Sequence, residues 1–234
     1  MADLNSTSGN YAIIVGGGSG SRMQSAIPKQ FLLLCGRPVL MHTIAAFHFS
    51  NTAPLIILVL PAPYHSHWKQ LCAEHDFNIP HTIVTGGETR FHSVKNGLDS
   101  IDCYKDSVIA VHDAVRPIID KVIIDNSYRQ ASGQGNAVAA VKSRDSVRLV
   151  DADSSRNILR DSVYMVQTPQ TFQAAQLKKA YQQPFNDKFT DDASVVEETG
   201  VKINLMEGSY RNIKITFPED IALAEAILKL PTAT

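Results

Sequence analysis

The sequence predicts an α/β fold in which a mostly parallel β-sheet is covered by helices on both faces. Short runs of β-branched and apolar residues, typical of buried strands, alternate with segments whose apolar residues recur at helical spacing. No Ser/Gly/Pro-rich linker or block of like charge divides the 234 residues, so we expect a single domain over residues 1–234. The expected strands are residues 11–15, 55–60, 79–84, 108–111, 137–141 and 213–216, and the expected helices are residues 38–49, 64–75, 120–130 and 218–230.

The composition argues against several classes of protein. Lysine and arginine number 22 against 23 for aspartate and glutamate, a balance that disfavours an extensive nucleic-acid interface. Cys35, Cys72 and Cys103 are widely spaced, without a CxxC pair, so we expect neither a disulfide framework nor a zinc site. No apolar run approaches the roughly 20 residues that span a bilayer, and the first residues lack a signal-peptide pattern. We expect a cytoplasmic protein with no nucleic-acid or membrane partner.

The first predicted strand breaks into a glycine-rich loop that two cations follow. Closely spaced glycines let backbone N–H groups approach an anion in conformations that other residues avoid. A mobile loop with solvated cations is the alternative, but the preceding strand and the following cations favour a triphosphate-binding loop. The glycines are Gly16, Gly17, Gly18 and Gly20, and the cations are Arg22 and Lys29.

Two familiar glycine motifs do not fit this loop. A Walker A loop ends in Gly-Lys-Ser/Thr, whereas Gly20 is followed by Ser21 and Arg22. The dinucleotide fingerprint GxGxxG needs a third glycine where Ser21 stands, which disfavours an NAD-dependent oxidoreductase.

A second polar segment, residues 112–117 with the sequence HDAVRP, follows a predicted buried strand. Magnesium bound to phosphates usually takes one or two protein carboxylates, and Asp113 stands where a parallel sheet presents ligands. Asp113 is therefore the best metal candidate, and its alternative role is a helix cap or a loop ion pair with Arg116. We expect His112 to pack and hydrogen-bond rather than to catalyse.

Ordered motifs between about residues 11 and 230 resemble the cytidylyltransferases that act on sugar-alcohol phosphates, and most of all the 2-C-methyl-D-erythritol 4-phosphate cytidylyltransferases of the non-mevalonate isoprenoid pathway. The resemblance implies a single-domain Rossmann-like nucleotidyltransferase fold and an enzyme that uses CTP, a sugar-alcohol phosphate and Mg²⁺. The motifs are GSGSRM at residues 18–23, PKQF at 28–31, GGETRFHSV at 86–94, HDAVRP at 112–117, QTPQTF at 167–172, TDDAS at 190–194 and NIKITFPED at 212–220.

The resemblance also implies a role for each matching residue. Without it, residues 86–94 predict a turn and a helix cap, residues 168–170 a turn, residues 190–194 the capped start of a helix, and Lys214 a solvated lysine on a strand. The implied catalytic residues are Arg22, Lys29 and Lys214. The implied CTP-binding residues are Gly16, Gly17, Gly18, Gly20, Gly87, Glu88, Arg90, Ser93 and Asp113, of which Asp113 also holds the metal. The implied acceptor-binding residues are Arg116, Ser146, Arg160, Thr168 and Thr190.

Two short alternating segments, residues 143–150 and 156–160, flank a polar turn and predict a protruding β-hairpin arm over about residues 143–165. A lone hairpin is at best marginally stable in water, so we expect the arm to pack against a second copy in a homodimer. The resemblance implies that Ser146 and Arg160 reach the neighbouring acceptor site. Exposed polar residues on the hairpin are the alternative interpretation.

The implied reaction transfers CMP from CTP to 2-C-methyl-D-erythritol 4-phosphate, giving 4-diphosphocytidyl-2-C-methyl-D-erythritol and pyrophosphate. Because the acceptor phosphate is already anionic, positioning and electrostatic stabilisation should supply most of the catalysis. A ribitol 5-phosphate cytidylyltransferase that makes CDP-ribitol is the close alternative. A non-catalytic nucleotide-binding module is the distant one.

Overall fold

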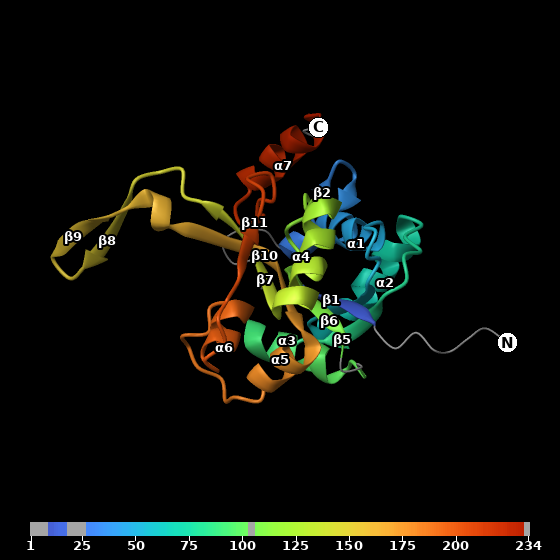
Figure 1. The fold of residues 1–234 in the computed structure, drawn as a ribbon. Coiled ribbons are helices and arrows are strands. Elements are labelled where there is room, and N and C mark those ends of the chain that lie inside the picture. The colour runs from blue at the N-terminus through green and yellow to red at the C-terminus, as the bar shows by residue number, and fades with distance from the viewer. Residues whose placement is uncertain (1–8, 18–26, 103–105, 232–234) are drawn as a thin grey trace.

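A computed structural model describes residues 9–17, 27–102 and 106–231. One sheet of seven strands forms its centre, in the order β11-β7-β10-β6-β1-β4-β5 (Figure 1). All neighbouring pairs are parallel except the two that β10 makes with β6 and β7, so the expected mostly parallel sheet is confirmed. The strands are β1 Asn10–Val15, β4 Leu55–Leu60, β5 Thr82–Thr85, β6 Val108–Asp113, β7 Asn136–Lys142, β10 Tyr164–Gln173 and β11 Leu205–Glu207.

Helices cover both faces of the sheet because successive strand residues point to opposite sides. Ile14 and Leu58 belong to the core under α1, α2 and α4, whereas Ile13 and Val59 belong to the core under α3, α5 and α6. A third, smaller core joins α7 to the short strand β2 and to the start of α1. The helices are α1 Val39–His48, α2 His65–Glu74, α3 Arg90–Asp99, α4 Lys121–Gln134, α5 Ala174–Ala180, α6 Asp192–Glu197 and α7 Glu219–Lys229, and the short pieces are β2 Leu33–Leu34, β3 Arg37–Pro38, η2 Lys29–Phe31, η3 Ala62–Tyr64 and η4 Arg160–Ser162.

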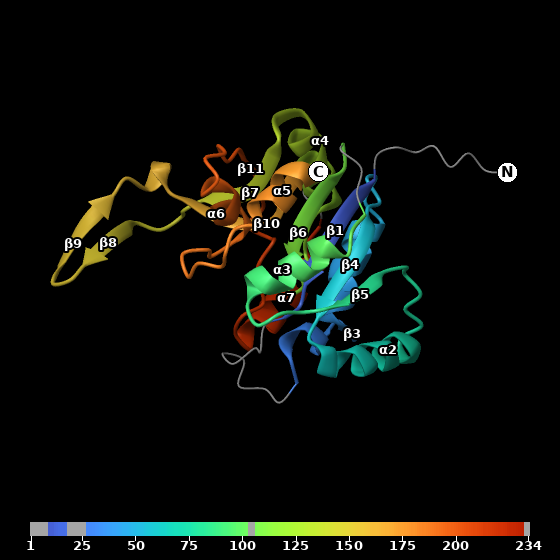
Figure 2. The same cartoon turned by 90° about the horizontal axis from the view of Figure 1, so that it is seen from below.

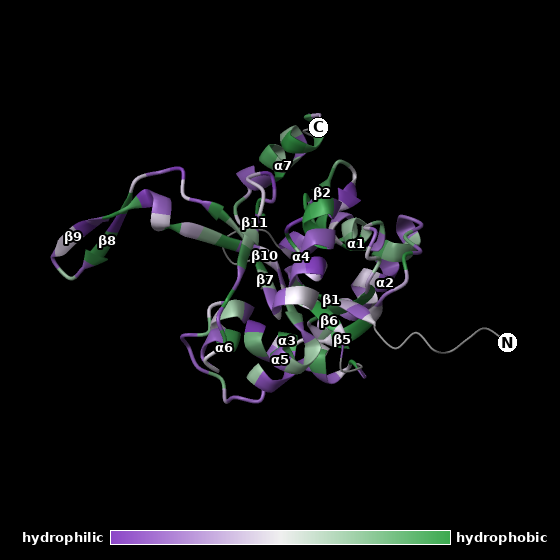
Figure 3. Cartoon of the chain, viewed as in Figure 1, coloured by the Kyte–Doolittle hydropathy of each residue, from purple (hydrophilic) through white to green (hydrophobic). Residues whose placement is uncertain are grey.

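The predicted hairpin arm is present and projects away from the body of the molecule (Figures 1 and 2). It consists of β8 Val147–Asp151 and β9 Ser154–Ile158, which pair only with each other. Apolar side chains on it face solvent in the single chain, with Val150 71% and Leu159 70% exposed. Figure 3 shows apolar residues along β8 and at the base of the arm.

Two predicted elements differ from the structure. Residues 213–216 form no strand: the backbone N–H of Ile215 donates to Val115 O (2.9 Å), its side chain packs in the α7 core, and β11 occupies the sheet edge instead. Residues 168–170, which alone predict a turn, lie within β10, at a shift of register between Val166 and Gln170 and beside a cis peptide before Pro169. A bulge thus takes the place of the predicted turn.

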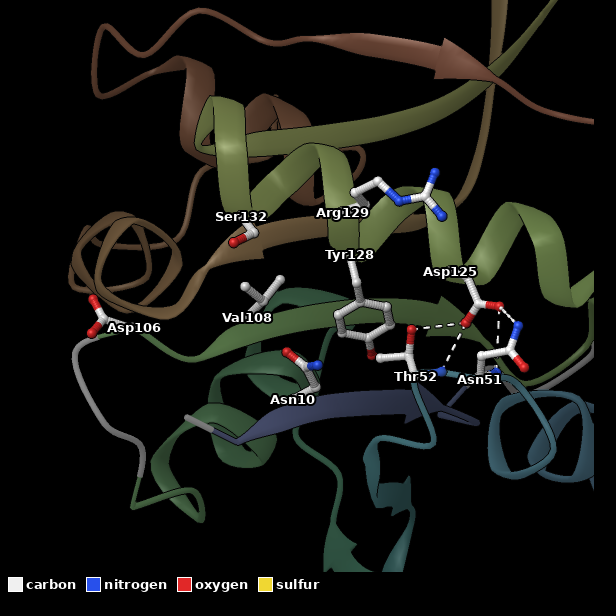
Figure 4. A pocket seen from close by; sticks show the side chains of 9 residues that line it. All are labelled: Asn10, Asn51, Thr52, Asp106, Val108, Asp125, Tyr128, Arg129 and Ser132. Carbon is white, nitrogen blue, oxygen red and sulfur yellow. Dashed lines mark hydrogen bonds between the residues drawn. The ribbon is translucent and has the colours of Figure 1, made fainter. Parts of the chain in front are cut away.

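At the edge where β1 and β6 begin, a polar cavity of about 420 Å³ lies between α4 and the loop that precedes β4 (Figure 4). Asp125 ties these two elements together. Its Oδ1 accepts hydrogen bonds from the backbone N and the hydroxyl of Thr52, both at 2.8 Å, and its Oδ2 accepts one from Asn51 Nδ2 at 2.8 Å. Among the described residues, no helix is long and apolar enough to cross a membrane.

Candidate active site

Two cavities lie at the opposite edge, where β1, β4, β5 and β6 end. The loop cavity, of about 420 Å³, is bordered by the loops that follow β1 and β5. The strand cavity, of about 250 Å³, is bordered by the bulged part of β10 and the segment before α6. Arg90, Asp113 and Lys214 line both cavities, so the two spaces meet at these side chains.

The loop cavity contains most of the described residues that the sequence assigns to the nucleotide. Gly17, Gly87, Glu88 and Ser93 line it together with Lys29. Lys29 is only 9% exposed, in the short helix η2. The predicted nucleotide residues and one predicted catalytic cation therefore share one space, although they come from segments more than fifty positions apart in the chain.

The glycines in this cavity are required by close packing. A Cβ on Gly87 would lie 2.4 Å from the Cβ of His92 and 2.9 Å from its backbone carbon, which no side chain tolerates. The Ser93 hydroxyl, 1% exposed as a residue, accepts from the Gly87 N–H (3.1 Å) and is 3.2 Å from where a Gly17 Cβ would stand. Gln30 Nε2 donates to Gly16 O (2.9 Å) and so fixes the backbone of Gly16. The backbone at this edge is thus held close to the cavity.

Asp113, the last residue of β6, is the centre of a cluster of cations. Its Oδ2 is 2.9 Å from Lys214 Nζ and 3.3 Å from Arg116 Nε, and its Oδ1 is 3.6 Å from Arg90 Nε. The carboxylate is 10% exposed. Sequence analysis left an ion pair with Arg116 open as the alternative role, and the structure shows that pair together with two further ones.

The cluster fixes the charge state of its members. Burial alone would raise the pKa of Asp113, but Arg90, Lys214 and Arg116 outweigh it and hold that pKa well below the ordinary value. Burial alone would lower the pKa of Arg90, but Asp192 and then Asp113 outweigh it and hold that pKa above the ordinary value. Both groups are ionised at any physiological pH, so Asp113 cannot supply a proton.

The strand cavity is built around backbone groups that Asn212 and Thr168 hold in place. The Asp113 N–H donates to Thr168 Oγ1 (3.1 Å), and Asn212 Nδ2 donates to Thr168 O (2.8 Å). Arg116 Nη1 donates to Asn212 O (2.8 Å), which directs the guanidinium toward the segment that carries Lys214. Arg116, Thr168 and Thr190, all assigned to the acceptor, line this cavity. The described acceptor residues on the body of the protein therefore come together.

His112 packs and hydrogen-bonds, as expected from the sequence. It is fully buried against Phe47, and its Nε2 donates to Arg116 O (3.2 Å), while Nδ1 has no hydrogen-bond partner among the residues that the structure describes. Burial is the main cause that lowers the pKa of His112 from 6.5 to about 4, so the imidazole is neutral near pH 7. A neutral ring held against a carbonyl oxygen supports the loop, in agreement with the packing role expected from the sequence.

The other predicted residues fall into two groups. Gly18, Gly20 and Arg22 are outside the residues that the structure describes. Ser146 and Arg160 are exposed on the arm, where Arg160 Nη1 donates to Arg144 O (3.3 Å), and neither lines the loop cavity or the strand cavity of its own chain.

The structure also reveals residues whose importance the motifs did not indicate. Asp192, within TDDAS, is fully buried and pairs with Arg90 (2.6 Å), whereas the sequence pattern indicated only an acidic first turn of a helix. The only sign in the sequence that Asp192 could have a special role was its place directly after Asp191, the N-cap of α6. Asn212 and Gln30 belong to the motifs but had no assigned role: Asn212 holds Thr168 O and Gln30 holds Gly16 O, and neither residue lines the loop cavity or the strand cavity.

The residues at this edge suit a magnesium ion that is held largely by phosphates. In the described part of the chain no group of three or more His, Cys, Asp or Glu residues could hold a metal alone. Asp113 and Glu88 are the carboxylates that line the loop cavity, and both oxygens of Asp113 already face cations. Magnesium commonly takes one or two protein carboxylates and completes its shell with phosphate oxygens and waters, which this donor set permits.

Comparisons with known proteins agree along nearly the whole chain. Residues 11–230 match the family model described as IspD, 2-C-methyl-D-erythritol 4-phosphate cytidylyltransferase. Proteins of that name from Bacteroides fragilis and Bacteroides thetaiotaomicron are each 46% identical, over 217 and 216 residues, covering 93% and 92% of this chain and 98% of each relative.

Solved structures show the same relationship. The 4-diphosphocytidyl-2C-methyl-D-erythritol synthase of Anaerococcus prevotii superposes with a TM-score of 0.81 at 30% identity, over 96% of this chain and 97% of that one. The 2-C-methyl-D-erythritol 4-phosphate cytidylyltransferase of Francisella tularensis gives a TM-score of 0.77 at 30% identity, over 94% and 99%. The chain belongs to the 2-C-methyl-D-erythritol 4-phosphate cytidylyltransferase family.

Proposed function

We propose that this protein transfers CMP from CTP to 2-C-methyl-D-erythritol 4-phosphate, releasing pyrophosphate, in isoprenoid precursor biosynthesis. One observation supports this most strongly: two cavities meet at Arg90, Asp113 and Lys214. A transfer between two phosphorylated substrates needs two adjoining spaces with cations at their junction, and a dinucleotide oxidoreductase or a nucleotide sensor does not. Family membership supports the same reading.

CTP occupies the loop cavity in this proposal. The backbone at Gly17 and Gly87 lies close to the nucleotide, with the Gly87 N–H held by the Ser93 hydroxyl, while Glu88 and Ser93 face the base and ribose. Lys29, at the other wall, faces the triphosphate. Gly18, Gly20 and Arg22 are assigned to the triphosphate by the sequence alone, since they lie outside the described residues.

The acceptor occupies the strand cavity. Arg116 binds its phosphate, and the hydroxyl groups of Thr168 and Thr190 face its polyol chain. Arg116 is held by Asp113 and by Asn212 O, so its guanidinium is oriented before the acceptor enters. A preorganised cation of this kind lowers the cost of bringing a second anion next to the triphosphate.

In the reaction, an oxygen of the acceptor phosphate attacks the α-phosphorus of CTP. The new P–O bond forms as the bond from the α-phosphorus to the bridging oxygen breaks, and the electron pair leaves with pyrophosphate. Lys29 and Lys214, together with Arg22, stabilise the charge that develops on the α-phosphate and the leaving group. No covalent intermediate on the enzyme and no general base are needed, because the nucleophile is already anionic.

We propose Mg²⁺ as the cofactor, with Asp113 as the protein residue that holds it. A magnesium ion bound to a triphosphate neutralises phosphate charge and orients the leaving group. The protein's own residues supply the remaining positive charge. Activity measured against magnesium concentration, with EDTA as the control, tests this assignment, and full activity in EDTA would contradict it.

We propose that the protein is a homodimer joined by the arm. The apolar surface of Leu149, Val150 and Leu159 supports this, as does a cavity of about 750 Å³ at the base of the arm beside Tyr164 and Tyr210. In a dimer, Ser146 and Arg160 would reach the partner's strand cavity. Val150→Glu should give a monomer by light scattering with lower turnover, while a dimer of unchanged mass would refute the interface.

The ribitol 5-phosphate alternative is separated by the acceptor. Pyrophosphate release should be measured with CTP, magnesium and each acceptor in turn, and a clear preference for ribitol 5-phosphate would overturn the proposal. The relatives and structural neighbours that carry the methylerythritol name support the first acceptor. We further propose a cytoplasmic location, where CTP is available, which fractionation of cells with an antibody to the protein would test.

Lys29→Ala tests the catalytic assignment. We expect turnover at saturating CTP to fall about 100-fold or more, as when one preorganised electrostatic donor is removed. Lys69→Ala, at an exposed position on α2, is the matched control and should leave turnover unchanged. Near-normal turnover of Lys29→Ala would remove Lys29 from the reaction.

A further inference from the structure

A buried carboxylate, Asp192, lies behind the cation cluster and touches neither cavity. It belongs to the first turn of α6, which lies beside α3 and α5 under the sheet in Figure 1. Its residue is 0% exposed, and an ionised carboxylate at such a depth is costly unless it is paired and hydrogen-bonded. Helix capping does not explain why this charge is buried, because Asp191 already caps α6.

The carboxylate of Asp192 accepts three hydrogen bonds, and two of them come from Arg90. Oδ1 accepts from Arg90 Nη1 (3.0 Å) and from the Tyr181 hydroxyl (2.6 Å), and Oδ2 accepts from Arg90 Nη2 (2.6 Å). The pair is bidentate, the strongest geometry for a guanidinium and a carboxylate. Both terminal nitrogens of Arg90 thus bind Asp192, and the nearest approach of Arg90 to Asp113 is that of Nε, at 3.6 Å.

This arrangement determines which cations pair closely with Asp113. With the fork of Arg90 occupied, Asp113 Oδ2 is available to Lys214 Nζ at 2.9 Å and to Arg116 Nε at 3.3 Å. If Asp192 lost its charge, Asp113 would be the nearest remaining carboxylate for Arg90, and a bidentate pair between them would compete directly with Lys214. Lys214 has 40% of its side chain exposed, so its contact with Asp113 is what fixes its position at the junction of the cavities.

We propose that Asp192, supported by the Tyr181 hydroxyl, is a positioning residue that keeps the terminal nitrogens of Arg90 from pairing with Asp113 and so keeps Lys214 aligned for the reaction. This inference rests on the proposed function, since it concerns a residue assigned to the same transfer. It assigns to the TDDAS segment a task at the cation cluster, in addition to the start of a helix.

The test is a double-mutant cycle between Asp192 and Lys214. Asp192→Asn should lower kcat about tenfold in the otherwise wild-type protein, within the coupling range of residues in one network. In a Lys214→Ala background the same change should lower kcat less than about twofold, because the lysine that Asp192 aligns is gone. Glu197→Gln, the same charge change at an exposed residue of α6, is the matched control and should behave as wild type.

Three outcomes overturn the proposal: an Asp192→Asn kcat equal to that of Glu197→Gln, an equal fold-loss in both backgrounds, or a crystal structure of Asp192→Asn in which Arg90 and Lys214 keep their distances to Asp113. If Asp192→Asn does not fold, Tyr181→Phe, which removes one hydrogen bond, should show the same coupling with a loss of a few-fold. Absence of pyrophosphate release by the wild-type protein would instead refute the proposed function, and the crystal structure would still decide the positioning role.

Discussion

His112 should make the stability of this protein fall as the pH decreases from neutrality. Its pKa is about 4 in the folded chain against 6.5 ordinarily, because the ring is buried, so between these values only the unfolded chain binds the proton. Each pH unit in that window costs the folded state about 1.4 kcal/mol. The contribution is fully present above pH 6.5 and declines as the pH falls toward 4.

The magnitude follows from the same two values. Between pH 7.5 and pH 5 the loss amounts to roughly 2 kcal/mol, and by pH 4 and below it approaches roughly 3 kcal/mol. In structural terms, the added proton would give Nδ1 a buried N–H without an acceptor, in a ring next to the guanidinium groups of Arg116 and Arg90. Nearby Asp113 offsets part of this cost but does not remove it.

Urea unfolding at a series of pH values measures this contribution. His112→Gln removes the titrating group and can still donate a hydrogen bond to Arg116 O, so its unfolding free energy should lack the roughly 2 kcal/mol decrease between pH 7.5 and pH 5. His112→Leu removes the hydrogen bond as well, and should be less stable at every pH but equally flat across this window. A pH dependence in His112→Gln that matches the wild type would refute the reasoning.

Two further predictions concern the loop cavity and the opposite edge of the sheet. Gly87→Ala should raise the KM for CTP by about tenfold or more, because the new Cβ would stand 2.4 Å from the Cβ of His92. Gly133→Ala is the control and should leave this KM unchanged, because its Cβ would meet no atom within 4 Å outside its own helix backbone. Equal KM values for the two variants would contradict the prediction. Asp125→Asn should lower the Tm by about 2–4 °C at neutral pH, since one of the two oxygens that accept from Asn51 and Thr52 becomes an NH2 donor. Burial alone would raise the pKa of Asp125, but those hydrogen bonds hold it below the ordinary value, so the difference in Tm should shrink in acid, and a constant difference would contradict the linkage.

Much of the fold is visible in the sequence because strand and helix periodicities are local properties. The runs at residues 55–60 and 108–111 became buried strands, and the segments before and after them became the expected helices. The errors arose where tertiary contacts decide. Ile213 and Ile215 alternate with Lys214 as in a strand, yet Ile215 packs against α7 and makes a single backbone hydrogen bond to Val115.

The site was predictable in its parts but not in its connections. Glycines and an aspartate after buried strands indicate ligand contacts, and the structure brings Gly17, Gly87 and Asp113 to one cavity. The pairing of Arg90 with Asp192, 102 residues away, has no local signature. The sequence suggested the ion pair of Asp113 with the nearby Arg116, but nothing around Asp113 indicates that cations from two distant segments, Arg90 and Lys214, share it. The fold brings these partners together, because the end of β6 lies close to the start of α3 and to the segment before α7.

The charge states of the site predict the pH dependence of the reaction. Asp113 is held ionised by Arg90, Lys214 and Arg116, and His112 is neutral above its pKa of about 4, so neither changes its charge between pH 5 and 8. The group that does titrate there is the acceptor phosphate, whose second pKa is near 6. Its dianion is the better nucleophile, so kcat/KM for the acceptor should rise tenfold per pH unit below about 6 and then level off. His112→Gln should leave this inflection in place, and an inflection that moved or vanished in that variant would show that the imidazole, rather than the substrate, controls the reaction.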